Sequence, residues 1–199
     1  YAITRYGKTY FIRYAQAMIA VDFPGIVAIS MGCMLRKTPN ERAFFSLLLE
    51  AAAHPKASAG SAMDRRERLV HKLLDMLSKS GQRRLVLFAD EAQKLAFEEY
   101  EWLREVHDAL EHKGFRMTTF LVGQPQLMNQ KNAMKLSGNS QIVARFMIEE
   151  SQFHGLRSMD DVKRCLKGYD TSQFPQGSDW SFTRFFLPKA WSHGYRLEF

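Results

Sequence analysis

Two short groups of residues could carry out phosphate chemistry together. Gly7-Lys8-Thr9 has the residue types that end a phosphate-binding loop. The glycine allows a tight turn, the lysine can reach the β- and γ-phosphates, and the threonine hydroxyl can bind Mg²⁺. Later in the chain the apolar run 85–89 ends in Asp90-Glu91, which indicates a buried parallel strand with two carboxylates at its carboxyl edge. There Asp90 could hold the metal and Glu91 could polarise an attacking water, so together the two groups predict an ATPase that uses ATP and Mg²⁺.

The loop departs from the full pattern at one position. That pattern has a further glycine five residues before Gly7, where this chain has Ala2, whose Cβ could crowd the turn. Alanine is the smallest replacement, so the match is weakened without being lost. An ordinary exposed turn is the alternative. A strand should precede such a loop, and none is present here, so we expect a chain trimmed from a longer protein. The residues expected to bind the nucleotide are Arg5, Tyr6, Gly7, Lys8, Thr9 and Asp90.

Length and composition limit the other possibilities. A chain of 199 residues with 46% hydrophobic content can bury one core, with room for a small appendage. No apolar run is long enough for a membrane span and no signal peptide is visible, so we expect no membrane partner. Cys33 and Cys165 are far apart and the six histidines have no zinc-ligand spacing, which favours free thiols in a reducing cytoplasm. The net charge of +7, from 28 basic and 21 acidic residues, favours a polyanionic partner besides ATP.

Helical and strand patterns alternate along the chain. Apolar periodicity, caps and Gly or Pro breaks separate the elements. This alternation predicts an α/β fold with a parallel sheet and helices on both faces. The expected helices are 8–21, 38–53, 64–80, 100–112 and 160–166, and the expected strands are 26–31, 85–91, 115–122 and 142–153.

Four segments, in this order, resemble the AAA+ ATPases of bacterial transposition, the TnsC/TniB group. They are Gly7-Lys8-Thr9, LVLFADEAQKL at 85–95, FLVGQPQL at 120–127 and IVARF at 142–146. Some of these features also occur in other bacterial AAA+ proteins, including ExeA-type secretion ATPases. The resemblance implies a P-loop NTPase of the AAA+ type, with a mainly parallel five-stranded sheet, over residues 1–167. Residues 168–199 are then an irregular, aromatic-rich extension, and the C-terminal helical lid is absent or trimmed.

The resemblance also implies roles for single residues. Lys8 would bind the phosphates, Thr9 and Asp90 would hold Mg²⁺, and Glu91 would be the catalytic base. The alternative for the two carboxylates is that they are solvated and suit the dipole of a following helix. Gln124 would be a polar sensor of the γ-phosphate or the attacking water, although a turn residue before a proline is the alternative.

Arg145 resembles a finger that one subunit supplies to the ATP of its neighbour, where its guanidinium stabilises transition-state charge. A surface arginine beside the buried Phe146 is the alternative. As a finger, Arg145 would make the monomer catalytically incomplete. ATP would then hold together a homo-oligomer, either a ring or a helical filament.

The family relation implies double-stranded DNA as a partner, together with a transposase and a target-selection protein, in the bacterial cytoplasm. Arg36 and Lys37 would contact DNA phosphates without sequence preference, unless they are an ordinary solvated basic pair. A solvated helix face or a subunit contact is the expectation for the basic cluster at Arg65, Arg66, Arg68 and Lys72. The alternative functions are an ExeA-type or signalling ATPase without DNA, and a nucleotide-dependent scaffold, against which Glu91 speaks.

Overall fold

A computed structural model describes residues 1–198 of the chain. It shows two compact units, one from Tyr1 to Phe153 and one from His154 onward. The division comes before the boundary that we expected at residue 167, because the helix α7 (Met159–Thr171) packs with the helix that follows it, at Phe182–Phe186.

The first unit is built on a parallel sheet of three strands, β1 (Val27–Gly32), β2 (Arg84–Asp90) and β3 (Arg116–Val122). The strand β2 is central and pairs in parallel with both neighbours. The α/β class with a parallel sheet is therefore confirmed, with three strands among the described residues instead of five.

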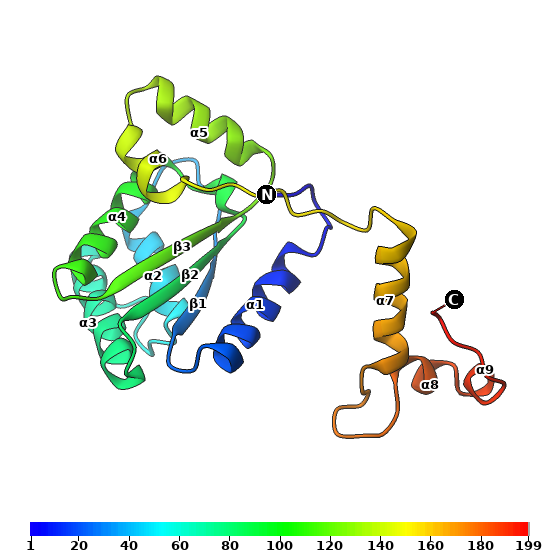
Figure 1. Ribbon diagram of the computed structural model, residues 1–199. Helices are drawn as coiled ribbons and strands as arrows, with labels where there is room; N and C mark the ends of the chain where they lie inside the picture. Colours follow the sequence, from blue (N-terminus) through cyan, green and yellow to red (C-terminus); the bar gives the residue numbers. More distant parts are fainter. Residues whose placement is uncertain (199) are drawn as a thin grey trace. The chain divides into compact units, whose positions relative to one another are not determined.

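Helices cover both faces of this sheet (Figure 1). The helix α1 (Lys8–Asp22) contacts β1 and β2 on one face. The other face carries α2 (Glu41–Ala51), α3 (Ala62–Ser80) and α4 (Phe97–Glu111).

The main core lies between the sheet and these three helices, and its largest fully buried side chains include Tyr100, Phe44, Phe45, Leu73 and Leu103. The apolar side chains of α2, α3 and α4 therefore pack against the sheet and against one another.

The predicted strand 142–153 is wrong. Residues Ser140–Phe146 form the helix α6, which follows another helix, α5 (Gln126–Leu136). Ile142, Val143 and Phe146 are buried. Phe146 follows Ile142 by four residues and Val143 by three, so all three side chains lie on one face of a helix. A run that alternates poorly but repeats with the helical period packs as a helix.

The edge of β3 opposite β2 has no neighbouring strand among residues 1–198. A groove of about 1100 Å³ lies along this edge, between β3, α1 and residues 146–153. Tyr1 and Ala2 lie beside the carboxyl end of β3, because the Ala2 N–H donates to the Gly123 carbonyl at 2.9 Å and the Phe153 N–H donates to the Tyr1 carbonyl at 2.8 Å. The start of the chain is thus fixed by the end of the sheet.

The second unit is helical, where we expected an irregular extension beyond residue 167. It contains α7, α8 (Phe182–Phe186) and α9 (Pro188–Ser192). The hydroxyl of Ser158 caps α7 in a capping box with Asp161. The ring of Phe174 stacks on the ring of Phe182, with 4.5 Å between the ring centroids. The same ring also contacts Phe185 and Phe186 at the end of α8. The aromatic residues of this region therefore pack on one another, while Phe185 stays 40% exposed and Phe186 63% exposed.

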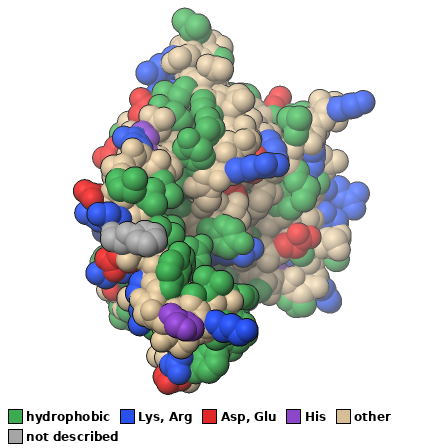
Figure 2. Space-filling model, turned by 90° about the vertical axis from the view of Figure 1, so that its right-hand side faces the viewer, with side chains coloured by type: hydrophobic (Ala, Val, Ile, Leu, Met, Phe, Trp, Pro, Cys, Tyr) green, Lys and Arg blue, Asp and Glu red, His purple; other side chains and the backbone are tan. Residues whose placement is uncertain are grey.

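Exposed hydrophobic side chains are common on the surface, as Figure 2 shows for one face. On α1, Tyr10 is 74% exposed and Val21 is 73% exposed. No helix among the described residues is long and apolar enough to cross a membrane.

Candidate active site

The N-terminal loop leads directly into α1. Gly7 is the residue before the helix and has φ +82°, a left-handed conformation that glycine adopts without cost. Arg5 has φ +63°, which is strained for a residue with a Cβ and is typical of ligand-binding loops. The free N–H groups of the first turn of α1 follow this loop, as in a site that binds phosphate.

The Lys8 ammonium is turned back into the loop. Its side chain is 6% exposed and donates to the carbonyls of Ala2 at 3.1 Å and Ile3 at 2.8 Å. Ala2, which stands where the full loop pattern has a glycine, is 2% exposed, so its small side chain is buried. The loop is thus closed around its own lysine, which can exchange backbone carbonyls for phosphate oxygens.

Thr9 and Asp90 are brought together although they are distant in sequence. The Thr9 hydroxyl donates to Asp90 Oδ2 at 2.6 Å. The first turn of α1 supplies the hydroxyl, and the carboxyl end of β2 supplies the carboxylate. A hydroxyl and a carboxylate oxygen are the hard ligands that Mg²⁺ prefers, so the residues present fit this ion.

Glu91 follows β2 in a left-handed conformation, with φ +56°. Its Oε2 accepts hydrogen bonds from Gln93 Nε2 at 2.9 Å and Gln124 Nε2 at 3.3 Å, and Lys94 Nζ lies 3.4 Å away. Partial burial raises the pKa of Glu91, but these three partners outweigh it, so that its pKa lies below the ordinary value. The carboxylate is therefore ionised at neutral pH and held by side chains from two elements.

The geometry thus brings Gln124, at the end of β3, to the carboxylate of Glu91. It also adds Gln93, to which the sequence reasoning gave no role. The side chain of Gln93 contacts both Glu91 and the backbone N–H of Gln124. Two signals pointed to it: Gln93 lies two residues after a predicted catalytic carboxylate, and it belongs to the segment 85–95 that carries the family resemblance.

Arg145 lies near the end of α6 and pairs with α4 of its own chain. Its guanidinium is 2.6 Å from Asp108 and 4.0 Å from Glu111. These partners differ from the loop and the β2 carboxylates, so the structure does not bring Arg145 to the other predicted residues of its own subunit.

Arg36 and Lys37 differ in their surroundings. Arg36 pairs at 3.2 Å with Glu99, whose side chain is 4% exposed, whereas Lys37 is exposed. Glu99 also accepts the backbone N–H of Ala96 at the start of α4. Arg36 is therefore engaged in the fold, and Lys37 is the more accessible of the two charges.

The basic side chains on α3 are less exposed to solvent, and more often paired within the fold, than we expected. Arg65 is buried and donates to the Arg42 carbonyl and to Ser46, so its place on a solvated face is wrong. Arg66 pairs with Glu105.

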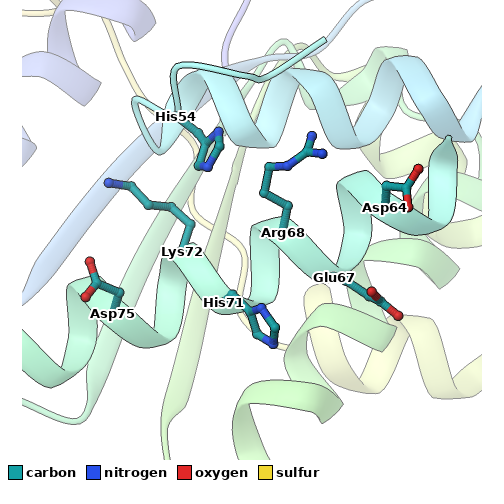
Figure 3. Close-up of a pocket in the computed structure, with 7 residues that line it drawn as sticks. All are labelled: His54, Asp64, Glu67, Arg68, His71, Lys72 and Asp75. Carbon is teal, nitrogen blue, oxygen red and sulfur yellow. The ribbon is translucent and has the colours of Figure 1, made fainter. Parts of the chain in front are cut away.

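Arg68 and Lys72 line a shallow hollow of about 500 Å³ with His54, at the end of α2 (Figure 3). Asp64, Glu67 and Asp75 border the same hollow, so its charges are mixed. This mixture does not match a phosphate site.

Cys33 and His107 are two further ionisable groups that are buried in the first unit. Burial raises the pKa of Cys33 to about 12, and Cys165 is exposed. Burial, with help from nearby Arg145, lowers the pKa of His107 to about 4, and His107 Nε2 lies 2.8 Å from the hydroxyl of Thr119. Among residues 1–198, no group of three or more His, Cys, Asp or Glu side chains is placed to hold a metal ion.

The comparisons with known proteins agree with this geometry. A family model described as "AAA domain" matches residues 1–130, which include the loop, both carboxylates and Gln124. No curated protein matches the chain.

Proposed function

The chain belongs to the AAA domain family, and on this premise we propose that it binds ATP with Mg²⁺ and hydrolyses ATP. The hydrogen bond between Thr9 and Asp90 is the observation that carries this proposal. It joins the start of the helix after the loop to the acidic end of the central strand, and these are the two places where a triphosphate and its metal would be held.

In the proposed reaction each residue has a distinct task. Lys8 leaves its two carbonyl partners and neutralises the β- and γ-phosphates, while Thr9 and Asp90 hold the magnesium ion. Bound magnesium would neutralise charge that develops on the phosphates. Glu91, ionised at neutral pH, accepts a proton from the attacking water, and Gln124 orients that water or the γ-phosphate.

Substitution of the base tests this part of the proposal. Glu91→Gln should reduce ATP turnover by a factor of about 100 or more and leave the affinity for ATP within about two-fold of wild type. Lys8→Ala should instead weaken nucleotide binding. Unchanged turnover in Glu91→Gln would exclude the assigned base.

We further propose that ATP is hydrolysed between subunits of a homo-oligomer, with Arg145 as the residue supplied in trans. The exposure of its side chain, 33%, supports this assignment, because the guanidinium can leave Asp108 for a neighbour's phosphate. Arg145→Ala and Lys8→Ala subunits, each inactive alone, should recover part of the activity when mixed. No recovery at any mixing ratio would contradict the assignment.

The finer function that we propose is regulation of transposition on duplex DNA in the bacterial cytoplasm. ATP-bound subunits would assemble on DNA and link a target-selection protein to a transposase, and hydrolysis would reset the assembly. The net charge of +7 and the exposed Lys37 support a DNA partner. ATP-dependent binding to random-sequence duplex should weaken steeply as salt rises, and equal binding with and without ATP would contradict the role.

One observation favours the alternative of an ATPase that acts on protein partners without DNA. Arg36, half of the predicted DNA contact, is already paired with the buried Glu99. If Lys37→Ala and Arg36→Ala leave any DNA affinity unchanged, the alternative is preferred.

A further inference from the structure

The side chain of Gln93 joins two parts of the candidate site. Its Nε2 donates to Glu91 Oε2 at 2.9 Å, and its Oε1 accepts the backbone N–H of Gln124 at 3.0 Å. One amide group therefore connects the turn after β2 with the end of β3. An amide suits this bridge, because its nitrogen donates and its oxygen accepts.

The surroundings of Gln93 are shaped to receive this bridge. A Cβ on residue 123 would lie 2.5 Å from Gln93 Oε1, so glycine at that position gives the amide room to approach the backbone. The turn is fixed from a third side by Gln130 of α5, whose Nε2 donates to the carbonyls of Gln93 at 2.9 Å and Leu95 at 3.0 Å. Gln93 is thus held at its main chain and at both ends of its side chain.

The contacts of the Glu91 carboxylate are unequal. The hydrogen bonds from Gln93 and Gln124, and the ion pair with Lys94, all fall on Oε2. None of them uses Oε1. Of these contacts, the one from Gln93 is the shortest, and it comes from a side chain whose other end is also fixed.

We propose that Gln93 is a positioning residue: it fixes Glu91 through Oε2, keeps Oε1 free to accept a proton, and ties this carboxylate to the strand end that carries Gln124. This inference rests on the proposed function, since Glu91 must be the base for its position to affect turnover. If the end of β3 moved at Gln124, the Gln93 side chain would move with it and displace the carboxylate of Glu91.

The test is a double-mutant cycle in the full chain. Gln93→Leu should lower kcat by about 10-fold or more through misplacement of the base, and leave KM and the affinity for a non-hydrolysable ATP analogue within about two-fold. In a Glu91→Gln background the same substitution should cause no further loss, because there is no carboxylate left to position. Gln93→Glu, which keeps the shape but loses the donor, should behave like Gln93→Leu.

A second readout needs no turnover. Gln93→Leu removes the acceptor of the Gln124 N–H, so hydrogen exchange at that amide should be faster in the nucleotide-free protein. Gln141→Leu, a matched change at an exposed glutamine on α6, should alter neither the exchange nor kcat.

The possible failures are distinguishable. Unchanged kcat in both Gln93 variants would overturn the positioning role. So would a double mutant whose fold-loss in kcat equals the product of the fold-losses of Gln93→Leu and Glu91→Gln alone. Unchanged turnover in Glu91→Gln alone would instead remove the proposed base.

Discussion

Gly123→Ala should damage the candidate site through one added methyl group. The φ of Gly123 is not positive, so alanine can adopt its backbone conformation, and the cost is steric. The new Cβ would lie 2.5 Å from Gln93 Oε1 and 2.7 Å from Leu127 Cδ1. Ordinary carbon contacts begin near 3.5 Å, so each neighbour would have to move by roughly an ångström.

The size of the effect follows from what these neighbours do. Leu127 is 8% exposed, and overpacking of such a side chain costs about 1–3 kcal/mol. Gln93 can swing away, but it then gives up hydrogen bonds to Gln124 N and the Glu91 carboxylate, and these groups are partly reached by water. A net loss of about 2 kcal/mol in the free energy of unfolding is expected, which lowers Tm by about 4–8 °C for a unit of this size.

Thermal unfolding and steady-state ATP turnover measure the two consequences. Gly32→Ala is the matched control, because Gly32 ends the neighbouring strand β1 and a Cβ there would meet nothing within 4 Å. We expect both Tm and kcat of Gly123→Ala to fall below those of Gly32→Ala. Equal values in the two variants would show that the close approach at Gly123 is not maintained in solution, and the bridge through Gln93 would lose its basis.

Three further predictions concern buried groups. The pKa of His107 is about 4 in the folded chain and about 6.5 in the unfolded chain, so the unfolded state binds more protons at acid pH. The free energy of unfolding, measured by urea titration, should therefore be about 2 kcal/mol lower at pH 5 than at pH 7.5. The folded chain should react with a thiol reagent at the exposed Cys165, while Cys33 should react only on unfolding, because its pKa of about 12 leaves almost no thiolate. Arg36→Ala should destabilise the chain by about 2–3 kcal/mol in a denaturant titration, since it leaves the buried carboxylate of Glu99 without its cation.

Each of these predictions has a control. His107→Leu should abolish the acid-dependent loss, whereas the exposed His71→Gln should retain it. Labelling of both cysteines in the folded chain would contradict the burial of the thiol. Lys37→Ala should change stability by less than about 0.5 kcal/mol, and an equal loss in Arg36→Ala and Lys37→Ala would refute the buried ion pair.

Much of the first unit could be predicted because its elements have clear patterns. The buried strand β2 ends at Asp90 and is followed by Glu91, and α3 has most of its apolar residues on one side. Such local signals determine where each element begins and ends. By contrast, α5 has the polar sequence Gln126–Leu136 with few buried residues, so nothing in its periodicity indicated a helix.

The candidate site was predictable only where chain connectivity determines it. Thr9 follows the loop glycine and Asp90 ends the central strand, so the parallel sheet must bring both to one edge. The role of Gln93 depends on a side-chain conformation and on the space left by Gly123, and neither can be read from spacing. The ion pairs of Arg36 and Arg145 are also tertiary contacts that local sequence does not reveal.

These two ion pairs have opposite consequences for the roles that the resemblance suggested. The pair between Arg145 and Asp108 is about one-third exposed on both sides, so it contributes no more than about 1 kcal/mol. An arginine finger supplies a rate factor of about 10³ or more, roughly 4 kcal/mol, which exceeds the loss of that pair. Release of Arg36 would leave the carboxylate of Glu99 buried without a partner, a cost that one exposed phosphate contact would not offset. The internal contacts are therefore compatible with Arg145 as a residue acting in trans, and they make Lys37 the better candidate for any contact with DNA.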